Sequence, residues 1–198
     1  PGGRADRRTG LRHTAHGGAA YVSSTPLATV LVPTHDHTHL IGYALRCIQE
    51  QRFKDFQLFV VGDGAPPATR EIVEQLGRSD RRIRYFDFPK GERHGEAHRH
   101  VALQQAQGRI VLYCGDDDLW LPNHLSGMTK LLAKVDFGHA VQINLCLDGI
   151  WVVGSGELSD PELRRKLRHV EAALFGLSVT GHSMAAYRRL SEGWSPAP

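Results

Sequence analysis

The chain lacks any apolar run approaching the roughly 18 residues that a membrane-spanning helix needs. It has only three cysteines among its 198 residues. Cys47, Cys114 and Cys146 are odd in number and widely spaced, which predicts neither a disulfide framework nor a zinc site. We expect them to be small buried residues in a reducing compartment. No apolar segment follows the basic N-terminus in the manner of a secretory signal, so a cytoplasmic location is expected.

A large charge of one sign is also lacking, because 24 basic residues stand against 21 acidic ones, for a net charge of +3. The first 24 residues account for this excess, because they contain four arginines and a single aspartate. The rest of the chain has no basic stripe that would neutralise a phosphate backbone, which argues against a nucleic-acid-binding protein. The arginine-rich tail allows peripheral contact with anionic lipid, although a solvated tail is the simpler expectation.

What the chain does have is apolar patterning, with 41% hydrophobic residues, enough to bury a core. Residues 1–26 show no periodicity and predict a disordered or expression-derived tail. From residue 27 onward short buried strands alternate with amphipathic helices. The strands are expected at 28–32, 57–61, 82–86 and 109–114, and the helices at 40–48, 66–77 and 96–106. This alternation predicts a parallel sheet covered by helices on both faces.

The pattern changes after residue 122. A helix is expected over 122–132, and another over 160–175. Asp148-Gly149, between two apolar runs, predicts a hairpin whose antiparallel strands extend the sheet. The segment HSMAAYRR (182–189) fits either a strand or a helix.

Polar residues follow three of the predicted strands. Ligands of open parallel sheets bind beyond the carboxyl ends of the strands, so these residues mark the candidate site. Adjacent aspartates repel one another, and a divalent cation such as Mg²⁺ or Mn²⁺, shared with substrate phosphates, would remove that cost. A turn followed by a helix cap is the alternative interpretation of the aspartates. The segments are Pro33-Thr34-His35-Asp36, Gly62-Asp63-Gly64 and Gly115-Asp116-Asp117-Asp118.

Two blocks, VLVPTHDHTHLIGYALRCIQEQRFKDFQLFVVGDG and GEAHRHVALQQAQGRIVLYCGDDDLWLP, resemble the family 2 glycosyltransferases. The resemblance is strong over 28–125 and weak over 126–194. It implies a GT-A fold, a Rossmann-like, mostly parallel sheet with an antiparallel C-terminal extension. It also implies that 27–125 form the nucleotide-sugar-binding half of one domain and that 126–198 form its acceptor-side half, truncated at the end.

The resemblance assigns the nucleotide contacts. Pro33, Thr34, His35 and Asp36 match the family segment that holds the base, with Thr34 offering its backbone and His35 stacking on the base. Asp63 matches the carboxylate expected to accept the N–H of the base. Arg99 matches an arginine that would face the diphosphate, although a helix-surface ion pair is the alternative.

The same resemblance places the cation, Mn²⁺ or Mg²⁺, at the aspartate run. Aligned on Trp120, the run puts Asp117 at the metal-binding position and Asp116 on the ribose or the metal. Taken as a plain D-x-D pair, the run would instead use Asp116 and Asp118.

The activity implied is transfer of a sugar, with inversion, from a nucleotide-diphosphate donor, most simply a UDP-sugar, to a hydroxyl acceptor of unknown identity. A carboxylate must accept the proton of that hydroxyl. In the family this base follows a segment resembling GHSMAAYRRLSEGW, so we expect it beyond Pro198. Within the chain the candidates are Asp148, Glu157, Asp160 and His182.

Two alternatives stay open at this point. The spacing of His35 and His37 after the first strand is also that of zinc metallohydrolases, although a solvated loop and helix start is the simpler interpretation. The missing base leaves room for a catalytically silent domain that only binds nucleotide-sugar. A dinucleotide-dependent oxidoreductase is disfavoured, because no glycine-rich loop follows the first strand.

Overall fold

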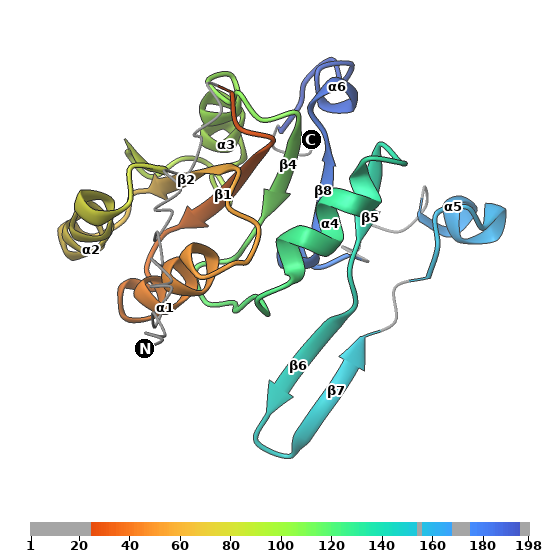
Figure 1. Cartoon of the computed structure of the whole chain (residues 1–198), viewed down its shortest axis with the longest axis horizontal. Coiled ribbons are helices and arrows are strands. Elements are labelled where there is room, and N and C mark those ends of the chain that lie inside the picture. The colour runs from red at the N-terminus through yellow and green to blue at the C-terminus, as the bar shows by residue number, and fades with distance from the viewer. Residues whose placement is uncertain (1–24, 154–155, 168–174, 195–198) are drawn as a thin grey trace, which may run out of the picture.

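The computed structural model describes residues 25–153, 156–167 and 175–194 (Figure 1). The tail expected over 1–26 lies almost entirely outside these ranges. Residues 168–174 of the helix expected over 160–175 also lie outside them, and the described part is α5, Pro161–Leu167. Among the described residues, no helix combines the length and the apolar character that crossing a bilayer requires.

The centre of the molecule is a six-stranded sheet in the order β3-β2-β1-β4-β8-β5. β1 (Ala28–Thr34), β2 (Phe56–Asp63), β3 (Ile83–Phe88) and β4 (Ile110–Tyr113) pair in parallel. β8 (Thr180–Ser183) runs antiparallel to β4, and β5 (Phe137–His139) runs antiparallel to β8. The predicted parallel sheet with an antiparallel C-terminal extension is therefore confirmed.

Helices cover both faces of this sheet, as the alternating pattern predicts (Figure 1). On one face α1 (Thr38–Gln49), α2 (Pro67–Ser79) and α4 (His124–Leu132) bury their apolar sides against Val30, Leu58 and Leu112. On the other face α3 (Glu96–Leu103) and α6 (Met184–Tyr187) pack against Leu31 and Val111. Neighbouring residues along one strand thus serve opposite cores, which explains why these strands are apolar without interruption.

Several predicted boundaries shift by a few residues. β1 continues through Pro33 to Thr34, because the last β1–β4 pair is Leu31 with Tyr113 and the missing N–H of Pro33 costs no bond to β4. α2 passes through Gly77 and ends at Ser79. Segment 182–189 contains both of the expected elements, since β8 ends at Ser183 and α6 begins at the next residue.

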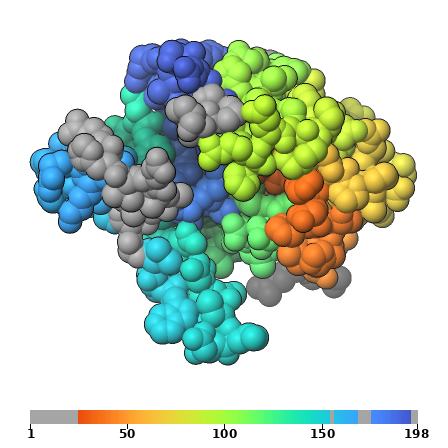
Figure 2. All heavy atoms as spheres, turned by 180° about the vertical axis from the view of Figure 1, so that it is seen from behind, coloured from red at the N-terminus to blue at the C-terminus, as the bar shows by residue number. Residues whose placement is uncertain are grey.

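The hairpin predicted at Asp148-Gly149 is present, formed by β6 (Gln142–Cys146) and β7 (Gly149–Val153). The prediction that it extends the main sheet is wrong, because β5 and β8 occupy that edge and the hairpin forms a separate two-stranded sheet. It projects from the body (Figures 1 and 2). Cys146 is consequently exposed, contrary to the prediction of three buried cysteines, while Cys47 is half-buried and Cys114 is buried.

Gln51 joins the end of α1 to the start of α4. Its side chain is fully buried, its amide N–H groups donate to the carbonyls of Cys47 and Leu121, and its oxygen accepts from the backbone N–H of Leu125. These bonds fix the segment that leads from the aspartate run into α4.

Replacing Gln51 with leucine should lower the free energy of unfolding by about 2 kcal/mol, because it leaves buried backbone groups without partners. Denaturant unfolding would measure the change. Gln75→Leu is the matched control, since Gln75 is exposed on α2 and its replacement should change stability by less than about 0.5 kcal/mol. Equal stabilities of the two variants would show that the Gln51 bonds contribute nothing.

His124, the first residue of α4, stacks on Trp120 with 4.3 Å between the ring centroids. Its Nε2 atom is buried and has no hydrogen-bond partner. Burial therefore lowers the pKa of His124 to about 4, because the neutral ring is favoured inside.

The unfolded chain binds a proton at this histidine near pH 6.5 and the folded chain only near pH 4, so stability should fall as the pH drops across that window. The loss expected from this group is at most about 3 kcal/mol. His124→Phe keeps the stacking and should flatten the dependence of unfolding free energy on pH. His39→Phe, at an exposed position, should follow the wild type, and a similar slope in all three proteins would contradict the prediction.

Candidate functional site

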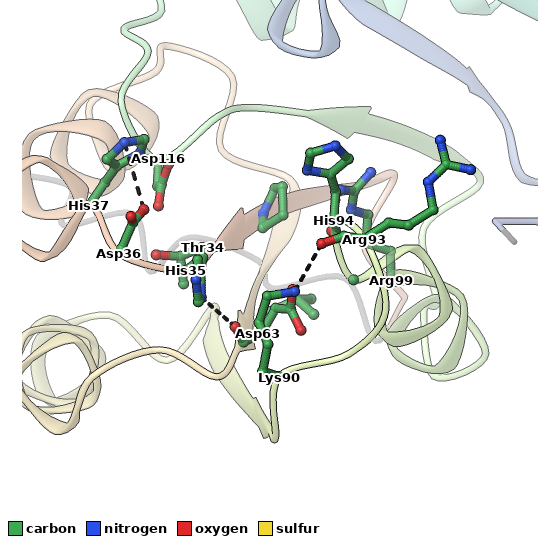
Figure 3. A pocket seen from close by; sticks show the side chains of 13 residues that line it. Thr34, His35, Asp36, His37, Asp63, Lys90, Arg93, His94, Arg99 and Asp116 are labelled. Atoms are coloured by element: carbon green, nitrogen blue, oxygen red, sulfur yellow. Dashed lines mark hydrogen bonds and ion pairs between the residues drawn. The ribbon is translucent and has the colours of Figure 1, made fainter. Parts of the chain in front are cut away.

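A cleft of about 180 Å³ lies beyond the carboxyl ends of β1, β2 and β4 (Figure 3). All seven residues predicted to contact nucleotide line this cleft, although they come from four separate segments of the chain. The arrangement follows from the parallel sheet, which brings strand ends to one edge. The residues lining the cleft are Pro33, Thr34, His35, Asp36, His37, Val61, Asp63, Lys90, Arg93, His94, Gly95, Arg99 and Asp116.

Asp63, the last residue of β2, binds the loop between β3 and α3. Its carboxylate accepts a hydrogen bond from the N–H of Gly91 at 2.6 Å and an ion pair from Lys90 Nζ at 2.8 Å. Burial favours the neutral acid, but these hydrogen bonds and the charge of Lys90 outweigh it and lower the pKa of Asp63. A carboxylate has about four acceptor positions, so Asp63 can also accept a ligand N–H.

Arg99 on α3 contributes a buried positive charge to one end of the cleft. It is 8% exposed, it stacks on Trp194, and one of its guanidinium nitrogens donates to the carbonyl of His94. Its Nε atom has no partner, and no carboxylate within the described residues forms an ion pair with it. A buried cation without a carboxylate favours an anionic ligand. Within the described residues, Arg99 therefore does not form the helix-surface ion pair that was its alternative interpretation.

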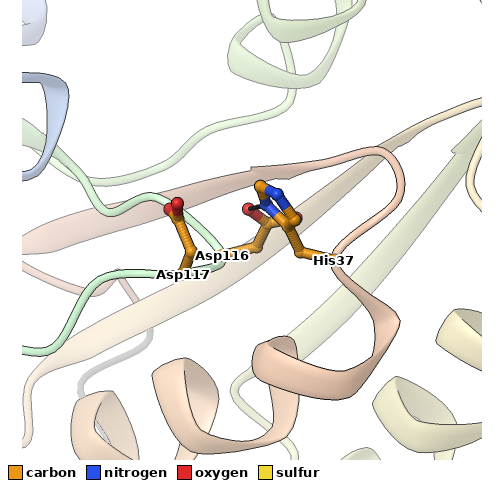
Figure 4. Close-up of side chains that lie close together, drawn as sticks. All are labelled: His37, Asp116 and Asp117. Carbon is orange, nitrogen blue, oxygen red and sulfur yellow. Dashed lines mark hydrogen bonds and ion pairs between the residues drawn. The ribbon is translucent and has the colours of Figure 1, made fainter.

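At the other end, the cleft is lined by His37 and Asp116, which form a cluster with the adjacent Asp117 (Figure 4). One ligand atom from each lies within 4.8 Å of the others. His37 Nδ1 is 2.9 Å from Asp116 Oδ1, and this hydrogen bond, followed by the negative charge of Asp116, raises the pKa of His37. Asp118 does not belong to the cluster, because its carboxylate accepts the hydroxyl of Ser178.

The cluster fits a divalent cation. Asp116 is 7% exposed, and its Oδ2 atom is buried without a hydrogen-bond partner. Leaving a carboxylate oxygen buried and unpartnered is costly, and a cation bound there would remove the cost. Two carboxylates and an imidazole suit Mn²⁺ and similar ions. Asp116 and Asp117 were predicted from the sequence to bind a cation together, whereas His37 was considered only as half of a zinc pair with His35.

His35 and His37 do not form the zinc pair considered from their spacing. His35 Nδ1 lies 2.7 Å from the backbone oxygen of Asp63, whereas His37 contacts Asp116. The ring of His35 thus contacts the end of β2 and that of His37 the loop that follows β4, and His35 is not part of the cluster.

The candidate bases lie outside the cleft. His182, on β8, is bonded to the hydroxyl of Tyr113 and lowered in pKa by burial. Asp160 accepts the N–H of Glu162 at the start of α5. Asp148 accepts a bond from Trp151 on the hairpin, and Glu157 accepts the hydroxyl of Ser159. None of the four lines the cleft.

Residues 90–94, which contribute Lys90, Arg93 and His94 to the wall of the cleft, were not predicted from the sequence. No periodicity marks them, and their signal is the glycine that precedes Arg99 by four residues. Gly95 has a φ of +69°, and a Cβ atom there would lie 2.7 Å from Asp63 Cγ. Glycine is thus required both by the backbone and by the close approach of Asp63.

Gly95→Ala should lower the free energy of unfolding by at least about 1–2 kcal/mol, the cost of a left-handed non-glycine residue, with the Asp63 clash in addition. The control is Gly127→Ala on α4, where an added Cβ meets no atom within 4 Å. That variant should be more stable than the wild type by about 0.5–1 kcal/mol. Chemical denaturation compares both, and a neutral Gly95→Ala would contradict this account of the loop.

The fold and the cleft together define an α/β protein with a charged cleft at the carboxyl ends of its parallel strands. The family model for glycosyl transferase family 2 matches residues 29–191, and the chain belongs to this family.

The chain is similar in sequence to two bacterial glucosyltransferases. The chain is 33% identical, over 62% of its length, to a GalNAc(5)-diNAcBac-PP-undecaprenol beta-1,3-glucosyltransferase of Campylobacter jejuni. It is 24% identical, over 54% of its length, to a UDP-Glc:alpha-D-GlcNAc-diphosphoundecaprenol beta-1,3-glucosyltransferase of Escherichia coli. The chain spans only 38% and 42% of these relatives.

A solved structure confirms the fold. The mannosyltransferase PcManGT of Pyrobaculum calidifontis, in complex with GDP-Man and Mn²⁺, superposes with a TM-score of 0.61 at 22% identity. The match covers 85% of this chain and 47% of that one.

Proposed function

We propose that this chain is the donor-binding part of a glycosyltransferase that moves a sugar from a nucleotide-diphosphate donor to a hydroxyl acceptor, with inversion. The observation that carries the proposal is the cleft itself, which is lined at one end by the buried Arg99 and at the other by His37 and Asp116, the two residues that cluster with Asp117. A diphosphate is the ligand whose charge suits both ends.

The nucleoside is assigned to the part of the cleft between β1 and β2. His35 is exposed there and oriented by the carbonyl of Asp63, so its ring is available for stacking. Thr34 and Asp63 supply polar atoms at the same place, and the buried Thr34 hydroxyl has no partner. UDP is the proposed nucleotide, since the name of the Escherichia coli relative specifies UDP-Glc.

The diphosphate is assigned to the space between the two charged ends of the cleft. Asp116 and Asp117 would hold Mn²⁺ or Mg²⁺, which when bound supplies Lewis-acid stabilisation of the departing diphosphate. Arg99 contributes a fixed positive charge from the opposite wall, where burial keeps water from screening it. Lys90 adds a further cation at the end of β2, held there by Asp63.

Inversion requires the acceptor hydroxyl to attack the anomeric carbon opposite the diphosphate. The new C–O bond forms as the bond to the diphosphate breaks, and the hydroxyl proton passes to a general base. We propose a sugar hydroxyl on a lipid-diphosphate carrier as the acceptor, because the names of both curated relatives specify undecaprenyl-diphosphate glycans. Use of such an acceptor would place the protein at a membrane surface.

The test is stabilisation against heat by nucleotides with and without Mn²⁺. UDP with Mn²⁺, at 100 times its dissociation constant, should raise the free energy of unfolding by about 2.7 kcal/mol. Asp117→Ala should remove the part of this effect that depends on Mn²⁺. The control Asp148→Ala, at an exposed hairpin position, should respond like the wild type.

Two further titrations, with GDP and with zinc, distinguish the proposed function from its alternatives. Stabilisation by GDP in preference to UDP would overturn the choice of base but keep the class of donor. Zinc binding with no response to any nucleotide would favour a hydrolase. Binding of a UDP-sugar without transfer of the sugar to an acceptor, and without release of UDP, would identify a silent binding domain. An unchanged response of Asp117→Ala would show that the cation site is wrongly assigned.

A further inference from the structure

His37 occupies the position that begins α1, where serine, threonine, aspartate or asparagine would be the usual choice. Its side chain makes no capping hydrogen bond to the helix. Its backbone carbonyl accepts the first helical N–H groups, from Leu40 and Ile41. The imidazole therefore contributes nothing to the start of the helix, and its identity there has another explanation.

The imidazole is instead turned toward the end of β4 (Figure 4). Its Nδ1 atom is 2.9 Å from Asp116 Oδ1, although the two residues are 79 positions apart in the chain. Asp117 completes a group of three potential ligand atoms within 4.8 Å of one another. Ligand atoms on opposite sides of a small divalent cation lie about 4.2 Å apart, so the three atoms need little movement to bind one ion.

A second observation shows that the group is built for a ligand and is more than a patch of surface charge. Asp116 is 7% exposed, and its Oδ2 atom is buried with no hydrogen-bond partner. The bond from His37 occupies only the other oxygen of that carboxylate. The side chain of His37 itself is 43% exposed, so it can turn to present a nitrogen to an ion.

We propose that His37 is a direct ligand of the divalent cation, together with Asp116 and Asp117, and that it makes the site prefer Mn²⁺ over Mg²⁺. Imidazole nitrogen suits transition metals, whereas Mg²⁺ binds oxygen ligands and keeps several waters. A site of carboxylates alone would accept both ions. The inference deepens the proposed function, since this cation is the one assigned to the donor diphosphate.

The test uses Mn²⁺ alone, so it does not depend on nucleotide binding or on activity. Pulsed electron paramagnetic resonance of the wild type with bound Mn²⁺ should show coupling to a directly coordinated imidazole nitrogen. His37→Gln, whose amide can still donate to Asp116, should lose that coupling. Its affinity for Mn²⁺ should fall at least about tenfold, with a much smaller change for Mg²⁺ in competition titrations.

His39→Gln is the matched control, because His39 is exposed two residues away and lies outside the cluster. It should keep both the nitrogen coupling and the Mn²⁺ affinity. Absence of nitrogen coupling in the wild type, or equal Mn²⁺ affinity in the wild type and His37→Gln, would overturn the proposal. Wild-type Mn²⁺ binding with nitrogen coupling but no response to nucleotides would support His37 ligation while contradicting the proposed function.

Discussion

The parallel pairing of β1 with both β2 and β4 is the constraint on which the site depends. β1 pairs with β2 as far as Thr34 and Gly62, but with β4 only as far as Leu31 and Tyr113. The chain leaving β4 therefore runs alongside the last residues of β1, with Cys114 still bonded to the carbonyl of Leu31. This offset leaves the crevice at the strand ends and brings Asp116 next to the segment that begins α1.

Opposite charges are separated along this crevice. Asp116 and its neighbours form a negative end at β4, while Arg99 and Lys90 lie at the other end (Figure 3). The negative end keeps an unpartnered carboxylate oxygen on Asp116, and the positive end keeps a buried guanidinium without a carboxylate. Neither end neutralises the other within the protein, so the fold leaves a polarised space that only a bound ion or anion would complete.

The sequence predicts the sheet well because burial on both faces makes β1, β2 and β4 almost continuously apolar, and these strands, with the more polar edge strand β3, alternate with helices in a way that leaves few topologies. The hairpin shows what such sequence patterns do not predict, namely the sheet to which a strand belongs. Alternation and the Asp148-Gly149 turn are local signals, and they establish that β6 and β7 pair with each other. Which sheet a hairpin joins depends on the edge that is free. Here β5, only three residues long and without a distinctive pattern, takes a place beside β8.

The residues of the site also differ in whether the sequence could predict them. Residues that follow strands, such as Asp63 and Asp116, were predictable because the end of a strand fixes where the next residues lie. His37 was not, because its partner Asp116 is set by the β1–β4 offset and by no spacing within the chain. Lys90 was also missed, since the loop that carries it is held in place by Asp63 through tertiary contacts alone. Because that carboxylate binds the loop and lines the cleft, the base recognition proposed for Asp63 would depend on the loop conformation as well as on Asp63 itself.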